Sequence, residues 1–135
     1  VVVGNAEESL INYDNSVLGT DKIIMVDSKV LYLALESADE AYFVCGIINS
    51  PTIRNIIDGY AVETNRGIDV LKYLAIPKYD NTSQTHKDIA RISEQIHDFC
   101  KIELKSLGKI DQSKLSALEG ALDALVIAMF AWFKR

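Results

Sequence analysis

His97 and Cys100 are the residues of this chain whose types and spacing come closest to a chemical site. They lie three positions apart in a segment with helical periodicity, so both side chains face the same side of the helix. Imidazole nitrogen and thiolate sulfur are ligands that zinc prefers, and a structural zinc site needs about four of them. The sequence offers no second pair at a matching spacing. We therefore interpret the two residues as a surface histidine beside a core cysteine, and predict no metal site.

Catalytic signatures are absent from the 135 residues. The sequence has no glycine-rich nucleotide loop, no P-loop, no H-E-x-x-H motif and no G-x-S-x-G nucleophile elbow. Cys45 and Cys100 stand in apolar contexts typical of reduced, buried thiols in a cytoplasmic protein. The longest charge-free apolar run, residues 124–133, is about half of what a membrane-spanning helix needs. We predict no catalytic residue here and no association with a membrane.

Charge is unevenly distributed along the chain. The net charge is −5, and 49% of the residues are hydrophobic, as in a folded globular protein. Residues 1–63 carry three basic against ten acidic side chains, whereas residues 64–135 carry eleven basic against nine acidic ones. Any contact with nucleic acid must therefore use a locally basic face in the second half.

The first half of the chain is predicted to contain strands followed by short helices. Residues 23–26 and 30–35 are rich in β-branched and aromatic residues, which favours strands. Ser37 and Glu40 form a capping box before a helix that is apolar all round, and this helix ends at Asn49. Ser50 and Pro51 predict a second helix, with the serine as its cap, which ends at Gly59.

The second half is predicted to end in two longer helices. Residues 60–63 are expected to be extended and are followed by a polar turn at 64–67. Residues 68–74 are expected to form a short strand and then one helical turn, and Pro77 is expected to end an edge strand. One helix begins near His86 and ends at Gly108. The last begins near Asp111 or Ser113, with a possible internal capping box at Ser116 and Glu119. The predicted fold class is α+β: a small mixed or antiparallel sheet with short buried helices, then two longer C-terminal helices.

Three segments share their order and spacing with one protein family. They read AYFVCGIINSPTIRNIIDGY (41–60), TNRGIDVLKYLAIPKYD (64–80) and HKDIARISEQIHD (86–98). Together they resemble the C-terminal target-recognition domain of adenine-specific DNA methyltransferases from bacterial and archaeal restriction–modification systems. The resemblance covers residues 23–133. It is looser at LEGALDALVIAMFAW (118–132), where Met129, Phe130 and Ala131 replace the family's usual Tyr-Gly.

The resemblance implies a division of labour between two domains. The family's catalytic Asn-Pro-Pro-aromatic motif and its glycine-rich methyl-donor loop are absent from the chain. We therefore expect residues 1–135 to be a single target-recognition domain, a fragment of a larger methyltransferase. An upstream catalytic domain of the same polypeptide would bind S-adenosylmethionine, flip an adenine out of the duplex and methylate it. The present domain would bind double-stranded DNA, with no cofactor of its own.

Recognition of bases requires arginine for guanine and asparagine or glutamine for adenine, and anchoring of phosphates requires lysine, arginine and hydroxyl groups. On these grounds the predicted DNA-binding residues are Arg54, Thr64, Asn65, Arg66, Lys72 and Lys78. The weaker candidates, in the loop after Pro77, are Asn81, Thr82, Ser83, Gln84 and Thr85. The conspicuous motif residues are expected to be structural: Asn49, Ser50, Ile76 and Pro77.

Two other interpretations stay open. A specificity subunit of a type I restriction enzyme has a similar domain followed by a long spacer helix, for which residues 86–107 are long enough as a beginning. Gly108 and the apolar helix after it favour the methyltransferase instead. A protein-interaction module without DNA binding is the alternative from another class, supported by the acidic net charge and the apolar stretch VIAMFAWF (126–133).

Overall fold

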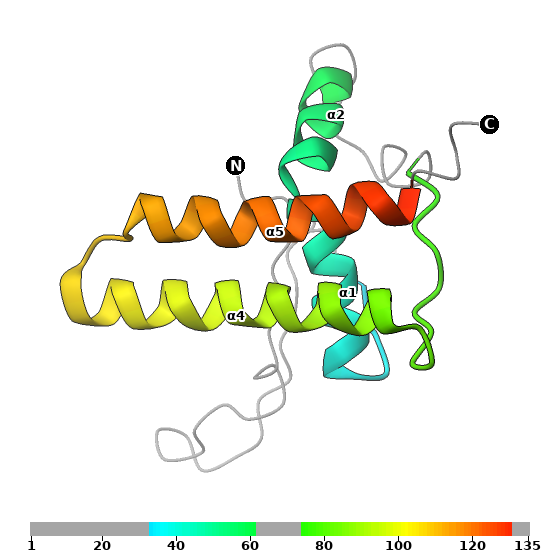
Figure 1. Cartoon of the computed structure of the whole chain (residues 1–135), viewed down its shortest axis with the longest axis horizontal. Helices are drawn as coiled ribbons and strands as arrows, with labels where there is room; N and C mark the ends of the chain where they lie inside the picture. Colours follow the sequence, from blue (N-terminus) through cyan, green and yellow to red (C-terminus); the bar gives the residue numbers. More distant parts are fainter. Residues whose placement is uncertain (1–32, 62–73, 131–135) are drawn as a thin grey trace, which may run out of the picture.

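The computed structural model describes residues 33–61 and 74–130. Within these ranges the chain forms the helices α1 (Ala38–Asn49), α2 (Pro51–Ala61), α4 (Gln84–Leu107) and α5 (Gln112–Phe130). Helices α4 and α5 run antiparallel as a hairpin, and the α1–α2 pair crosses it nearer one end (Figure 1). Helix α1 packs mainly against α4, and α2 packs against α5.

The start of α1 confirms half of the predicted capping box. The Ser37 hydroxyl accepts a hydrogen bond from the N–H of Glu40 at 3.2 Å. The Glu40 carboxylate accepts instead from the N–H of Glu36, at 3.3 Å, rather than from that of Ser37. The helix therefore begins where the sequence indicates, with the second hydrogen bond displaced by one residue.

The junction between α1 and α2 lies at Ser50, as predicted, but its capping group is different. Pro51 opens α2, where its missing N–H leaves no donor unsatisfied. The Ser50 side chain is fully buried, and its hydroxyl has no hydrogen-bond partner in the described part of the chain. The N–H of Thr52 donates to the Asp123 carboxylate of α5 at 2.9 Å instead. Helix α2 continues past the predicted stop at Gly59 to Ala61.

The hairpin follows its predicted boundaries closely. Helix α4 begins two residues before His86, because Ser83 serves as its cap, and it ends at Gly108 with φ at 65°. The Asp111 carboxylate accepts from the N–H of Ser113 at 3.0 Å and starts α5. Glu119, predicted to close an internal box, forms an ion pair with α2 instead.

The α+β prediction is wrong for the described residues, which contain helices, turns and unpaired extended backbone but no strand. Residues 33–35 are unpaired, residues 60–61 belong to α2, and Pro77 lies in irregular backbone. The other residues predicted to be extended, 23–26, 30–32, 62–63 and 68–73, lie outside the described ranges. Strand propensity mostly reflects how well a side chain packs. Here Leu74, Ile76 and Tyr79 pack against the helical core, without a neighbouring strand.

The core lies where the α1–α2 pair crosses the hairpin. Its most buried side chains, each at most 2% exposed, are Phe43, Ile47, Ile89, Leu122 and Val126. Nearer the hairpin turn α5 is the described helix beside α4, and Ile102, Leu104 and Leu107 are more than half exposed. A search of the described helices found none with the length and hydropathy needed to cross a membrane.

Candidate functional site

The structure describes two of the six predicted DNA-binding residues, Arg54 and Lys78. The other four lie in the range 62–73, outside the described residues: Thr64, Asn65, Arg66 and Lys72. The described residues nearest to them in sequence are the end of α2 and the segment that begins at Leu74. That segment, residues 74–83, leads into α4 and carries Lys78.

The Arg54 side chain forms an ion pair within the fold. Its guanidinium Nη2 lies 3.0 Å from Oε1 of Glu119, and the two side chains are 36% and 25% exposed. The pair ties α2 to α5 beside the contact between Thr52 and Asp123. A DNA phosphate or base edge would have to compete with Glu119, so Arg54 is a poorer candidate than its residue type suggests.

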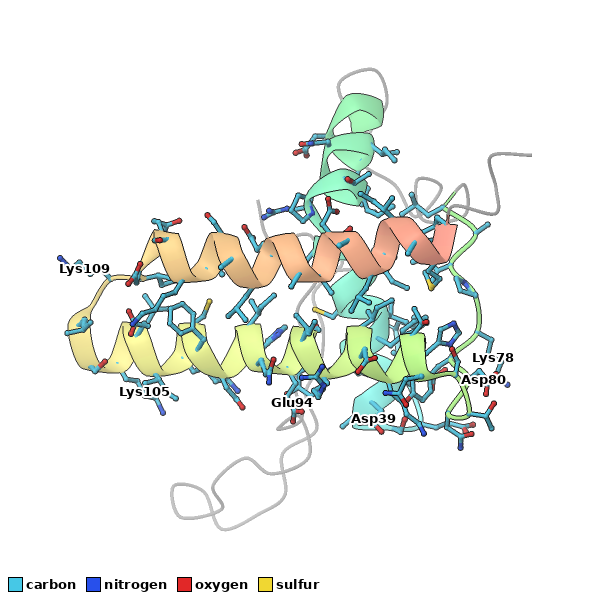
Figure 2. All side chains as sticks on the ribbon, in the orientation of Figure 1. Asp39, Lys78, Asp80, Glu94, Lys105 and Lys109 are labelled. Carbon is cyan, nitrogen blue, oxygen red and sulfur yellow. The ribbon has the colours of Figure 1, made fainter. Side chains whose placement is uncertain are left out.

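Lys78 is exposed on the segment that precedes α4. Figure 2 shows Lys78 and Asp80 at the same end of the molecule, beside the first turn of α4. Lys78 is therefore presented to solvent, whereas several of its polar neighbours have partners within the protein. Thr82 bonds Asp80, Ser83 caps α4, and Gln84 donates to Asp88.

Three rings hold the Lys78 segment against α1. Phe43 is fully buried, and its ring centroid lies 5.4 Å from that of Tyr79 and 4.5 Å from that of His86. Tyr79 and His86 lie 6.1 Å apart. Aromatic contacts at these separations add to the burial of the rings themselves. Burial, followed by the charges of Asp39 and Asp80, raises the pKa of Tyr79.

Hydrogen bonds of Asp80 give the segment a defined turn. Its carboxylate accepts from the N–H of Thr82 at 2.8 Å and from the Thr82 hydroxyl at 2.7 Å. These bonds lower the pKa of Asp80, because they favour the charged carboxylate. Its own N–H donates to Nδ1 of His86 at 3.0 Å. The residues flanking Lys78 on its C-terminal side are thus fixed by rings and by hydrogen bonds. We call residues 78–82 the Lys78 turn.

A second polar cluster includes His97, which the sequence analysis interpreted as a surface residue beside Cys100. The structure brings Cys45 of α1 to His97, with 3.9 Å between Sγ and Nε2. Nδ1 of His97 faces the Ser93 carbonyl at 2.9 Å, so Nδ1 carries the proton and donates it. The Asn49 amide donates to the Cys45 sulfur at 3.2 Å. The sequence did not predict the approach of Cys45, because 52 positions separate it from His97.

A pocket of about 170 Å³ opens beside this cluster, and it is lined in part by Asn49, Arg54, His97, Cys100 and Glu119. Burial, with a smaller contribution from the Glu119 charge, raises the pKa of the Cys100 thiol. A protonated thiol is a poor nucleophile and a poor metal ligand. Among the described residues no three potential ligands gather closely enough to hold a metal ion.

The anchored Lys78 turn is an exposed arrangement that a partner could contact. It combines an exposed cation with fixed backbone, which suits the binding of an anion such as a phosphate group. Comparisons with models of protein families, with curated proteins and with solved structures each found no match to this chain.

Proposed function

We propose that this chain is the sequence-specific DNA-recognition domain of an adenine-specific DNA methyltransferase from a restriction–modification system. One observation supports the proposal. The family resemblance rests on three segments (41–60, 64–80 and 86–98), and described residues of these segments pack on one another. Phe43 of the first segment contacts both Tyr79 of the second and His86 of the third. Residues far apart in the sequence thus behave as parts of one structural unit, as expected if the order and spacing of the segments reflect a shared fold.

In this proposal the residues between α2 and the Lys78 turn provide the contacts to bases. Arg66 and Asn65 carry the donors and acceptors that suit base edges, while Lys72 and Lys78 neutralise phosphates. Arg54 has a lesser role because Glu119 already pairs with it. S-adenosylmethionine would bind to a catalytic domain of the same polypeptide, in the cytoplasm, where the DNA of the cell lies.

From the net charge of −5 we predict how the affinity for DNA depends on salt. Most of the molecule repels the DNA backbone, so affinity depends on a few cations and falls steeply with salt. Replacing one phosphate contact should lower the slope of log K against log salt by about 0.9. A base contact should instead change which sequences are bound.

Fluorescence anisotropy with labelled random-sequence duplex DNA, over a series of salt concentrations, tests the proposal. Lys78→Ala should weaken binding and reduce the salt slope by about 0.9. Lys105→Ala is the matched control, because Lys105 lies near the opposite end of α4 in Figure 2, and it should bind like the wild type. Sequencing of the bound duplexes should show a preferred sequence that Arg66→Ala relaxes. Absence of duplex binding at every salt concentration, with the catalytic domain also restored, would overturn the proposal.

A protein-interaction module is the second candidate, favoured by one observation. Ile102, Leu104 and Leu107 are 65%, 54% and 62% exposed on the part of α4 nearest the hairpin turn. Leu104 and Leu107 lie three positions apart on one face of α4, whereas Ile102 lies on another face. Exposed apolar side chains on one face are typical of surfaces that bind other proteins. The duplex titration separates the two candidates, because a protein-interaction module would show neither a salt-dependent affinity nor a preferred sequence.

A further inference from the structure

The imidazole of His86 accepts a hydrogen bond from a backbone N–H, a role that a backbone carbonyl group usually has. The N–H of Asp80 donates to Nδ1 of His86 at 3.0 Å. A ring nitrogen accepts a hydrogen bond only when it carries no proton, so this imidazole is neutral and its proton is on Nε2. The backbone N–H of His86 donates to the Ser83 hydroxyl at 3.4 Å. One residue therefore joins the Lys78 turn to the first turn of α4.

The ring has little freedom to move away when it is protonated. Its centroid lies 4.5 Å from that of Phe43, with 32° between the ring planes, and 6.1 Å from that of Tyr79. Phe43 is fully buried, so the contact belongs to the core. A proton gained at Nδ1 would therefore meet the Asp80 N–H directly, and two donors would face each other.

The charges around His86 determine what protonation would do. The turn contributes the Asp80 carboxylate, the Tyr79 hydroxyl and the Lys78 ammonium group. Asp39 contributes a carboxylate from α1, close enough to raise the pKa of Tyr79. On α4 the adjacent charged residues are Lys87 and Asp88. The charge of a protonated His86 acts on Asp80 in the direction that lowers the pKa of that carboxyl, so the two groups attract each other.

We propose that His86 is a pH-sensitive positioning residue for the Lys78 turn. In its neutral form it accepts the Asp80 N–H and fixes the turn in the arrangement shown in Figure 2. When it takes up a proton from solvent, the backbone hydrogen bond is lost, and the imidazolium donates to the Asp80 carboxylate instead. That carboxylate is then drawn away from Thr82, and the turn that presents Lys78 rearranges. The two arrangements differ by an exchange of hydrogen bonds, as in other histidine switches.

The consequence for DNA rests on the proposed function, but the switch itself does not. The exchange of hydrogen bonds depends on whether Nδ1 of His86 carries a proton, so pH is the variable that controls it. Protonation should weaken the contribution of Lys78 to DNA binding, while a residue far from the turn, such as Lys105, should be unaffected. The hydrogen bond can be followed without DNA, at the amide of Asp80.

Nuclear magnetic resonance of the 135-residue chain tests the switch directly. In the wild type the hydrogen-exchange protection of the Asp80 amide should fall about tenfold as pH decreases, which is the equivalent of one hydrogen bond of about 1.4 kcal/mol. The midpoint should coincide with the titration of the His86 ring nitrogens, observed by their nitrogen-15 shifts. His97 lies outside the Lys78 turn, so its ring signals provide an internal reference that the Asp80 amide should not follow.

Two variants distinguish the effect of the Nδ1 acceptor from the effect of ring stacking on Phe43. His86→Asn keeps an acceptor close to the position of Nδ1 and does not titrate, so protection at Asp80 should persist at every pH in this range. His86→Phe keeps the stacking on Phe43 but has no acceptor, so protection should be low throughout. Equal protection in His86→Phe and the wild type, or no change at Asp80 while His86 titrates, would overturn the proposal.

DNA binding provides the last measurement. The ratio of wild-type to Lys78→Ala affinity should approach one below the midpoint in the wild-type background, and should stay constant with pH in the His86→Asn background. A ratio that is independent of pH in both backgrounds would show that the turn does not position Lys78. Absence of duplex binding at every pH would overturn the proposed function. The hydrogen-exchange protection of the Asp80 amide would still show whether His86 acts as a switch.

Discussion

At the scale of single residues, the start of α2 shows that nearby residues can predict where a helix begins without predicting which residue caps it. The sequence predicts a helix start at Ser50 and Pro51, and the structure confirms it. The predicted cap is wrong, because the cap comes from Asp123, 71 positions from Thr52. Its two carboxylate oxygens accept from the N–H and the hydroxyl of Thr52, both at 2.9 Å. A carboxylate at the N-terminus of a helix also interacts favourably with the helix dipole.

Replacing Asp123 by alanine should therefore destabilise the fold. The variant loses two hydrogen bonds to a charged group, and we expect the free energy of unfolding to fall by about 2 kcal/mol. Urea denaturation followed by circular dichroism measures this change. Asp98→Ala is the matched control: Asp98 is exposed on α4, and its replacement should change the stability by less than about 0.5 kcal/mol.

Ser50→Ala distinguishes the observed cap from the predicted one. A serine that caps a helix is worth about 1 kcal/mol. Because the Ser50 hydroxyl is buried without a partner among the described residues, its removal should leave stability unchanged or raise it slightly. A loss of about 1 kcal/mol in the same urea experiment would mean that Ser50 does cap α2 in solution.

At the scale of elements, helices were predictable because their starts and ends depend on nearby residues. Ser37, Gly108 and Asp111 act within a turn of their position, so the sequence contains the whole signal. Among the described residues the strand prediction failed because apolar side chains such as Leu74, Ile76 and Tyr79 can pack against a helical core from irregular backbone, without a neighbouring strand. The Lys78 turn depends on Phe43 and His86, which come from two other elements. Lys78 was predicted as a DNA-binding residue from its residue type alone, and the contacts that anchor its turn were not predictable.

The contact between α1 and α4 depends on a glycine. A Cβ added at Gly46 would lie 3.0 Å from Cβ of Ser93 and 3.1 Å from Cγ2 of Ile89, whereas one added at Gly120 of α5 would meet nothing within 4 Å. Overpacking of a core costs about 1–3 kcal/mol, and alanine in a helix gains about 1 kcal/mol over glycine. We expect Gly46→Ala to destabilise and Gly120→Ala to stabilise. Thermal unfolding of both should give shifts of opposite sign; shifts of the same sign would contradict the close packing.

At the scale of the whole molecule, the buried residues of the described part are concentrated at one end of the hairpin. The buried residues of α4 are confined to 89–93, and those of α5 are Leu122 and Val126. All of these lie where α1 and α2 cross the hairpin. Residues 101–114 lie beyond that crossing, and none of them is buried. Local opening costs least where few apolar contacts are broken.

Native-state hydrogen exchange should reveal this gradient. Amides of α1 and of residues 89–97 should exchange only through global unfolding, while those of residues 100–107 should exchange through local opening of the hairpin end. Protection factors would then differ by about tenfold or more between the two ends of α4. Uniform protection along α4 would indicate that another surface covers the hairpin end in solution.

The turn between α4 and α5 has a practical consequence for anyone who wishes to follow this protein in a cell. Gly108 and Lys109 are exposed, the turn reverses the chain away from the core, and the helices on either side are capped by their own residues. Such tips tolerate inserted sequence. A fluorescent domain or an epitope placed after Lys109 should leave the fold intact, and it would stand at the opposite end of the hairpin from Lys78 (Figure 2).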